Sequence, residues 1–93
     1  MNTYELTFLV KPDEKTGEKE AAKVKGWVEA AKGEVKDSQS IGVKDLAYPL
    51  AHAREALFWS MVFSTDSVGV GEVERRLRIE PEILRFLLVR PEV

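Results

Sequence analysis

Few residues of this chain could take part in catalysis, and these few do not form a catalytic pattern. His52 is the only histidine, it has no serine and aspartate pattern near it, and the chain contains no cysteine. The segment from Lys11 to Glu18 contains a glycine, but its three carboxylates would repel a phosphate group. Glu18 and Glu20 are explained better by a solvated helix face than by acid–base catalysis. We therefore expect a protein that is not an enzyme and that uses no metal and no cofactor.

The size and charge of the chain limit what it can bind. Its 93 residues suit one small domain, which we expect to span residues 1–93. Fourteen lysines and arginines against 16 acidic residues leave a formal net charge of -2. No bulk field therefore attracts nucleic acid or an anionic membrane. If the protein binds RNA, it requires a local basic patch or a partner that supplies most of the charge.

Nothing in the sequence is typical of export or membrane insertion. The lack of cysteine excludes disulfides and is compatible with a reducing compartment. The first five residues do not resemble the basic start of a signal peptide. The longest apolar runs are far shorter than the ~20 residues of a membrane helix. We expect a cytoplasmic protein.

A compact apolar segment from Gly42 to Leu50 lies near the middle of the chain. The residue before a proline is driven towards extended geometry, so the Tyr48-Pro49 step excludes a long helix here. Proline cannot donate a hydrogen bond to a central strand ladder, so Pro49 should end a strand or lie at a sheet edge. The segment is expected either as a buried loop entering a hairpin or as part of a family signature.

Periodic patterns around this segment predict four strands and two helices. Alternation predicts strands at 4–10, 35–43, 57–63 and 83–90, and the polar centre of the second strand suggests a sheet edge. Apolar spacing of three and four predicts a helix within 13–32, entered near Thr16 and Gly17 and stopped at Gly33. A second helix is expected between the cap-rich residues 64–67 and Pro81, with acidic residues early and arginines late. Residues 51–55 are expected to form a loop or short turn.

This order, β-α-β-β-α-β, predicts an α+β fold of the ferredoxin-like type, with two helices on one face of a four-stranded antiparallel sheet. The helices should cover the alternating apolar residues of the strands. The opposite face is expected to be open, and an apolar open face suggests a binding partner, although scattered surface apolar residues are also common. The residues expected there are Thr7, Leu9, Phe58, Ser60, Val62, Arg85, Leu87 and Val89.

Several motifs, in order, resemble the bacterial small-subunit (30S) ribosomal protein S6 family. The resemblance covers nearly the whole chain, beginning at Tyr4-Glu5-Leu6 and continuing through Lys11-Pro12-Asp13. Its most specific part is the run from Gly42 to Leu50, with Lys44 before Leu-Ala-Tyr-Pro-Leu. The motifs around Phe58-Trp59, Glu74 to Arg78 and Leu84 to Arg90 complete it.

The resemblance implies a structural protein that binds the central domain of small-subunit rRNA as a heterodimer with the small basic ribosomal protein S18. A basic partner would supply the charge that this chain lacks. The rRNA-binding residues that it implies are Asn2, Tyr4, Lys44, Arg78, Arg85 and Arg90. The partner-binding residues are Ser38, Gln39, Ile41, Val43, Leu46, Tyr48 and Phe58. Tyr48 could equally be a core aromatic residue, and Arg78 could equally serve the helix dipole.

Some residues depart from the family pattern. Asp45 stands where a second basic residue is usual, Glu80 occupies a position that can be basic, and Asn2-Thr3 lacks basic residues. The chain also stops at Val93, without the long tail that helps relatives to hold the partner. We therefore expect RNA affinity to depend strongly on the heterodimer.

Three other readings use the same topology. An RNA-recognition motif fits poorly, because residues 56–63 lack its basic-glycine-aromatic start. An acylphosphatase-like hydrolase conflicts with the acidic loop after the first strand. A regulatory ferredoxin-like module that self-associates through its open sheet face, without RNA, is the main alternative function.

Overall fold

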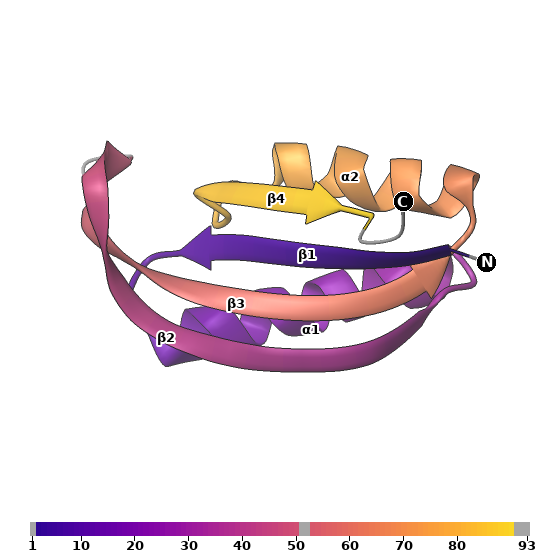
Figure 1. Cartoon of the computed structure of the whole chain (residues 1–93), viewed down its shortest axis with the longest axis horizontal. Helices are drawn as coiled ribbons and strands as arrows, with labels where there is room; N and C mark the ends of the chain where they lie inside the picture. The colour runs from indigo at the N-terminus through magenta and orange to yellow at the C-terminus, as the bar shows by residue number, and fades with distance from the viewer. Residues whose placement is uncertain (1, 51–52, 91–93) are drawn as a thin grey trace.

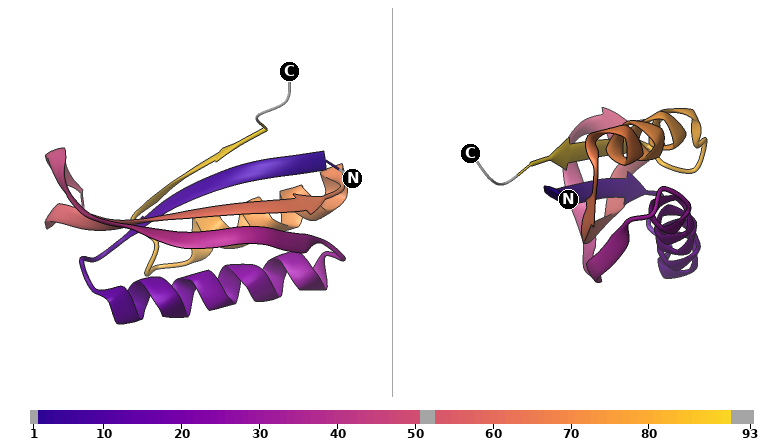
Figure 2. Two further views of the ribbon diagram at one scale, coloured as in Figure 1. Left: turned by 60° about the horizontal axis from the view of Figure 1, so that its bottom comes forward. Right: turned by 90° about the vertical axis from the view of Figure 1, so that its right-hand side faces the viewer.

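The computed structural model describes residues 2–50 and 53–90 as two helices packed on one face of a four-stranded antiparallel sheet (Figure 1). The strand order β2-β3-β1-β4 confirms the predicted ferredoxin-like fold. Figure 2 shows both helices on the same side of the sheet. The elements are β1 Asn2–Val10, α1 Glu14–Ala30, β2 Glu34–Leu50, β3 Ala53–Thr65, α2 Ser67–Ile79 and β4 Arg85–Val89.

Two strands, β2 at the sheet edge and β3 in the sheet centre, are longer than predicted. β2 continues without a break through the apolar segment to Leu50, and it lies at the sheet edge as its polar centre and Pro49 predicted. β3 already begins at Ala53, so the expected loop at 51–55 is wrong for residues 53–55. Leu50 pairs with Ala53. His52 lies outside the described residues.

The helix ends use different residues from those expected. α1 begins at Glu14 rather than near Thr16, because the Asp13 side chain caps it by accepting from the Lys15 amide at 3.0 Å. At the other end, Lys32 adopts the left-handed conformation with φ 61°, and the Gly33 amide donates to the Val28 carbonyl at 2.8 Å. This is the Schellman arrangement, so Gly33 follows the left-handed residue instead of providing it.

Asp66 caps α2 by accepting from the Gly69 amide at 2.7 Å. The first turn of α2 contains no acidic residue, so the expected early acids lie further along the helix. Arg76 and Arg78 do lie in the last turn, where a positive charge suits the helix dipole. The helix ends before Pro81, and Glu80 is extended, as a residue before proline should be.

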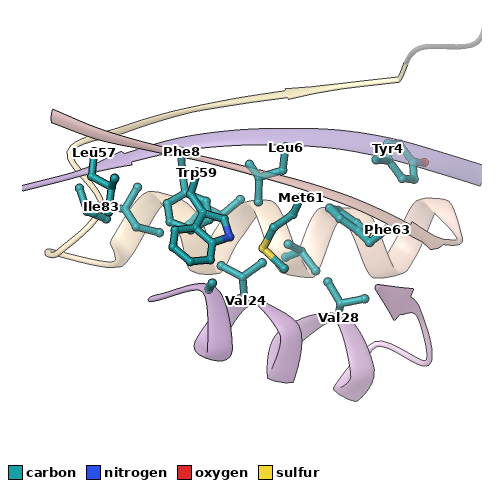
Figure 3. Packing of buried hydrophobic residues seen from close by; sticks show 14 residues of the cluster. Tyr4, Leu6, Phe8, Val24, Val28, Leu57, Trp59, Met61, Phe63 and Ile83 are labelled. Atoms are coloured by element: carbon teal, nitrogen blue, oxygen red, sulfur yellow. The ribbon is translucent and has the colours of Figure 1, made fainter. Parts of the chain in front are cut away.

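The core lies between the sheet and the two helices (Figure 3). The predicted inward residues of β3 are all buried, and Val73 and Leu77 of α2 join them. Leu9 lies on the opposite face, as expected, but it is only 8% exposed. Its direct neighbours are Phe58 and Arg85 on the adjacent strands, and side chains of this length can cover a central-strand leucine laterally.

A buried carboxylate lies at the edge of this core. Glu20 is 0% exposed, and neither of its side-chain oxygens accepts a hydrogen bond from the described residues. Lys23 Nζ lies 3.5 Å from Glu20 Oε2 and donates to Glu80 Oε2 at 3.0 Å. Burial raises the pKa of Glu20, and the negative charge of Glu80 raises it further. The ionised form of Glu20 therefore opposes folding.

Replacing Glu20 with glutamine is expected to stabilise the protein at neutral pH by about 1 kcal/mol. A raised pKa means that the folded state binds the proton more tightly than the unfolded state, whose carboxyl titrates near 4.5. The stability that protonated Glu20 contributes is therefore lost as the pH rises through its folded pKa. Urea unfolding between pH 4 and 8 should show the advantage of Glu20→Gln growing above pH 4.5.

Glu18→Gln is the matched control, because Glu18 is exposed on the same helix. Its effect on the free energy of unfolding should stay within about 0.5 kcal/mol and should not grow with pH. A Glu20→Gln variant that is less stable than the native sequence at neutral pH would show that the Lys23 ion pair outweighs the cost of burial.

Candidate interface for RNA and a protein partner

β2 and β3 extend beyond the rest of the sheet as a two-stranded ribbon. β1 ends where Val10 pairs with Leu57, whereas β2 and β3 pair further, at Lys44 opposite Ala56 and, after an irregularity between Asp45 and Leu50, at Leu50 opposite Ala53. Figures 1 and 2 show this ribbon projecting past the end of β1. A two-stranded ribbon is only marginally stable by itself, and its edges can pair with another chain. The ribbon is therefore a candidate binding element.

A β-bulge lies at the base of the ribbon. Ser40 pairs with Trp59 and Gly42 pairs with Phe58, so Ile41 is the extra residue. Gly42 has a φ of 113°, a conformation that glycine adopts without strain. Ile41 and Val43 are 43% and 47% exposed. The bulge thus presents two apolar side chains to solvent on the outer strand.

The open face of the sheet is built from cross-strand rows. One row at the ribbon end runs from Gly42 through Phe58 and Leu9 to Arg85. The next row is Gln39, Ser60, Thr7 and Leu87, and the third is Asp37, Val62, Glu5 and Val89. Leu87 is 63% exposed and Val89 39% exposed. The face is therefore mixed, with its most exposed apolar residues on β4.

The residues assigned to RNA contact fall at separate places. Lys44 and Arg85 are exposed at the ribbon end of the open face, and Lys44 Nζ lies 5.9 Å from the centre of the Phe58 ring. Asn2 and Arg90 lie together at the opposite end, where Arg90 Nη2 donates to Asn2 Oδ1 at 2.9 Å. The described residues therefore place these four positions at two ends of the sheet instead of in one patch.

Two of the residues assigned to RNA contact, Tyr4 and Arg78, lie apart from the others. The Tyr4 ring is buried in the core with its centre 5.7 Å from that of Phe63, so it cannot stack on a base. Arg78 lies on α2, on the helix layer, and donates to Glu74 Oε2 at 3.0 Å. Its side chain is 68% exposed, so this ion pair holds it only weakly.

The residues assigned to partner contact lie along β2 and on Phe58. Gln39 and Phe58 belong to the open face. Ser38 lies on the helix side, where its Oγ accepts from Trp59 Nε1 at 2.9 Å, and Val43 is opposite the buried Leu57 on the same side. Leu46 is half-buried. The backbone of Tyr48 is part of β2, and its side chain is outside the part of the structure that is described. Ile41 and Val43 are therefore the members that offer exposed apolar surface.

The part of the chain that the structure describes contains neither a metal-binding cluster nor a membrane-spanning helix. Among the described residues there is no cluster of three or more histidine or acidic side chains arranged to hold a metal ion. Neither described helix is long and apolar enough to cross a membrane. The candidate binding features are a strand edge with two exposed apolar residues, and basic side chains at two ends of the sheet.

Comparisons with known proteins identify the family. The family model described as ribosomal protein S6 matches residues 3–90. The chain is 34% identical over 96 residues to the small ribosomal subunit protein bS6 of Geotalea daltonii, covering 99% of this chain and 73% of the relative. It is 35% identical over 91 residues to the bS6 protein of Synechococcus sp. strain RCC307, covering 96% of this chain and 67% of the relative.

The fold comparison agrees with these sequence matches. The crystal structure of 30S ribosomal protein S6 from Thermotoga maritima superposes with a TM-score of 0.86 at 27% identity, covering 96% of this chain and 86% of that one. An uncharacterized protein of the same organism shares the fold alone, with a TM-score of 0.58 and 18% identity. The family predicted from the motifs is confirmed. The chain belongs to the ribosomal protein S6 family, whose members are structural, non-enzymatic components of the small ribosomal subunit.

Proposed function

We propose that the protein binds the central domain of small-subunit rRNA as a heterodimer with ribosomal protein S18. The observation that carries this proposal is the separation of its basic residues. Lys44 and Arg85 lie at one end of the sheet and Arg90 at the other, in a chain with a net charge of -2. Because these contacts are few and dispersed, they release few counterions. The chain alone should therefore bind RNA weakly.

In this proposal the protein partner contacts the exposed outer strand and the RNA contacts the sheet ends. Ile41 and Val43 are exposed apolar residues that a partner can cover, and Lys44 follows directly at the boundary with RNA. Arg85, Arg90 and Asn2 complete the proposed RNA contacts through phosphate and sugar groups. One domain spanning residues 1–93 would carry both surfaces.

A salt-resolved binding titration on a central-domain rRNA fragment, with and without S18, tests the proposal. We expect RNA binding only in the presence of S18, and we expect its affinity to fall as salt rises. Tight binding by this protein alone at moderate salt would contradict the dependence on S18. No binding under either condition would contradict the proposal itself.

The exposed apolar residues of β4 favour one second candidate, a homodimer through the open sheet face. Leu87 and Val89 could pack against a second copy there, because they are the most exposed apolar residues on that face. This module would need no RNA. A homodimer that Leu87→Arg dissociates, found together with absent rRNA binding, would favour it over the ribosomal assembly role.

A further inference from the structure

The outer edge of β2 carries a repeated charge motif on both sides of an uncharged centre. Lys36-Asp37 precedes the six uncharged residues 38–43, and Lys44-Asp45 follows them. All four charged residues are exposed. Among the described residues, none of the four forms a salt bridge, and no strand pairs with this edge. Both the charges and the edge of the strand are thus available to another chain.

We propose that the protein forms a homodimer in which two copies of β2 pair antiparallel along this edge. In one register Lys36 lies opposite Asp45 of the second copy, and Asp37 lies opposite Lys44 of the second copy. The twofold axis repeats both pairs, so the dimer contains four opposite-charge pairs, because each copy presents the same surface to the other. The uncharged centres meet between them.

The bulge at Ile41 is what allows this register. Side chains along a regular strand alternate between faces, so residues 37 and 44 would point to opposite faces of an unbroken strand. The extra residue reverses the alternation. Asp37 lies opposite Val62, and Lys44 lies opposite Ala56, so both belong to the open face. Directly opposed residues of two paired strands must share a face, and the observed bulge meets this requirement for Asp37 and Lys44. Lys36 is the extra residue of a second irregularity, between Val35 and Asp37, and has no direct partner on β3.

The uncharged residues that would be paired across the dimer also lie on matching faces of the sheet. Gln39 and Gly42 both lie on the open face, opposite Ser60 and Phe58. Ser38 lies opposite Met61, and Val43 lies opposite Leu57, so both lie on the helix side. In the proposed register Gln39 lies opposite Gly42 of the second copy, and Ser38 lies opposite Val43 of the second copy. The dimer would cover Val43, which is 47% exposed in the monomer.

The dimer uses the edge that is also proposed to bind S18. Ser38, Gln39, Ile41 and Val43 belong to both surfaces, so a second copy and S18 should exclude each other. This consequence rests on the proposed function, whereas the dimer itself does not. The homodimer would keep an exposed strand edge covered in protein that has not been assembled into a ribosome.

Sedimentation velocity over about 10 µM to 1 mM protein tests the dimer. The native chain should show a reversible dimer. Lys44→Asp should weaken it roughly tenfold, because like charges then face each other at two positions. The double variant Asp37→Lys with Lys44→Asp should restore it, because the exchanged charges pair again. Lys25→Asp makes the same charge change on the exposed face of α1 and should have no effect.

Three results would overturn the proposal: a monomer at every concentration, a dimer that is unchanged by Lys44→Asp, or a double variant as weak as the single one. Addition of S18 separates the two proposals. Conversion of the homodimer into a heterodimer would support the proposal that the second copy and S18 use the same edge of β2. A homodimer that persists with S18 bound would overturn that proposal. A dimer that S18 does not bind counts against the proposed function only.

Discussion

Gly33→Ala is expected to destabilise the protein by about 2–3 kcal/mol, whereas Gly26→Ala is expected to stabilise it by up to about 1 kcal/mol. A Cβ atom at Gly33 would lie 2.5 Å from the carbonyl oxygen of Ser64 and 2.9 Å from Val28 Cγ1. The carbonyl belongs to the β3 backbone, which cannot move without disturbing the pairing of Glu34 with Ser64. The substitution therefore forces apart the end of α1 and the sheet.

Gly26 is the matched control for this effect. It lies in the exposed interior of α1, and a Cβ atom there would meet no atom within 4 Å. Alanine at this position only removes the conformational cost of glycine in a helix. Urea unfolding of both variants measures the two effects. Equal stability of Gly33→Ala and the native chain would show that the contact between position 33 and the Ser64 carbonyl is looser than the structure indicates.

Simple periodicity was sufficient to predict the core of the sheet. A period of two assigns every second residue to one face, and Leu57, Met61 and Phe63 are buried as that pattern requires. The same rule placed Leu9 on the correct face but did not predict its burial, because alternation reports the face of a residue and says nothing about its lateral neighbours. Phe58 and Arg85 were distant in sequence from Leu9, and only the strand register brings them beside it.

The ends of elements depended on interactions that a local pattern does not contain. Thr16 and Gly17 looked like a helix entry, yet α1 is capped by Asp13, whose carboxylate accepts from the Lys15 amide. Gly33 looked like a left-handed stop, yet Lys32 takes that conformation. The close approach of Ser64 from another strand is what restricts position 33 to glycine, and no helix pattern predicts a contact with β3.

Candidate interface residues could be named from the sequence, whereas their arrangement on the sheet could not. Lys44 and Arg85 were assigned on motif resemblance, and the structure places both at the ribbon end of the open face. Tyr4 was assigned in the same way and lies in the core. The bulge at Ile41 could not be predicted, because it depends on how β2 aligns with β3. That alignment decides on which face of the sheet each charged residue of β2 lies.

Val43→Asp is expected to weaken S18-dependent rRNA binding by at least about 2 kcal/mol, or roughly thirtyfold in Kd. The side chain is 47% exposed at the base of the ribbon, so a charge there should leave the monomer folded. In the proposed heterodimer the same position is covered by S18, and a carboxylate would have to be desolvated without a partner. The rRNA titration with S18 present measures this loss.

Val68→Asp provides the comparison that assigns the loss to the ribbon. Val68 is 77% exposed on the first turn of α2, on the helix layer and away from the ribbon. The same substitution there adds the same charge at a position where the helix dipole tolerates it. Its rRNA affinity with S18 should equal that of the native chain. If both variants bound equally well, S18 would not contact β2 at this point; if both lost affinity equally, added negative charge rather than contact at the ribbon would explain the effect.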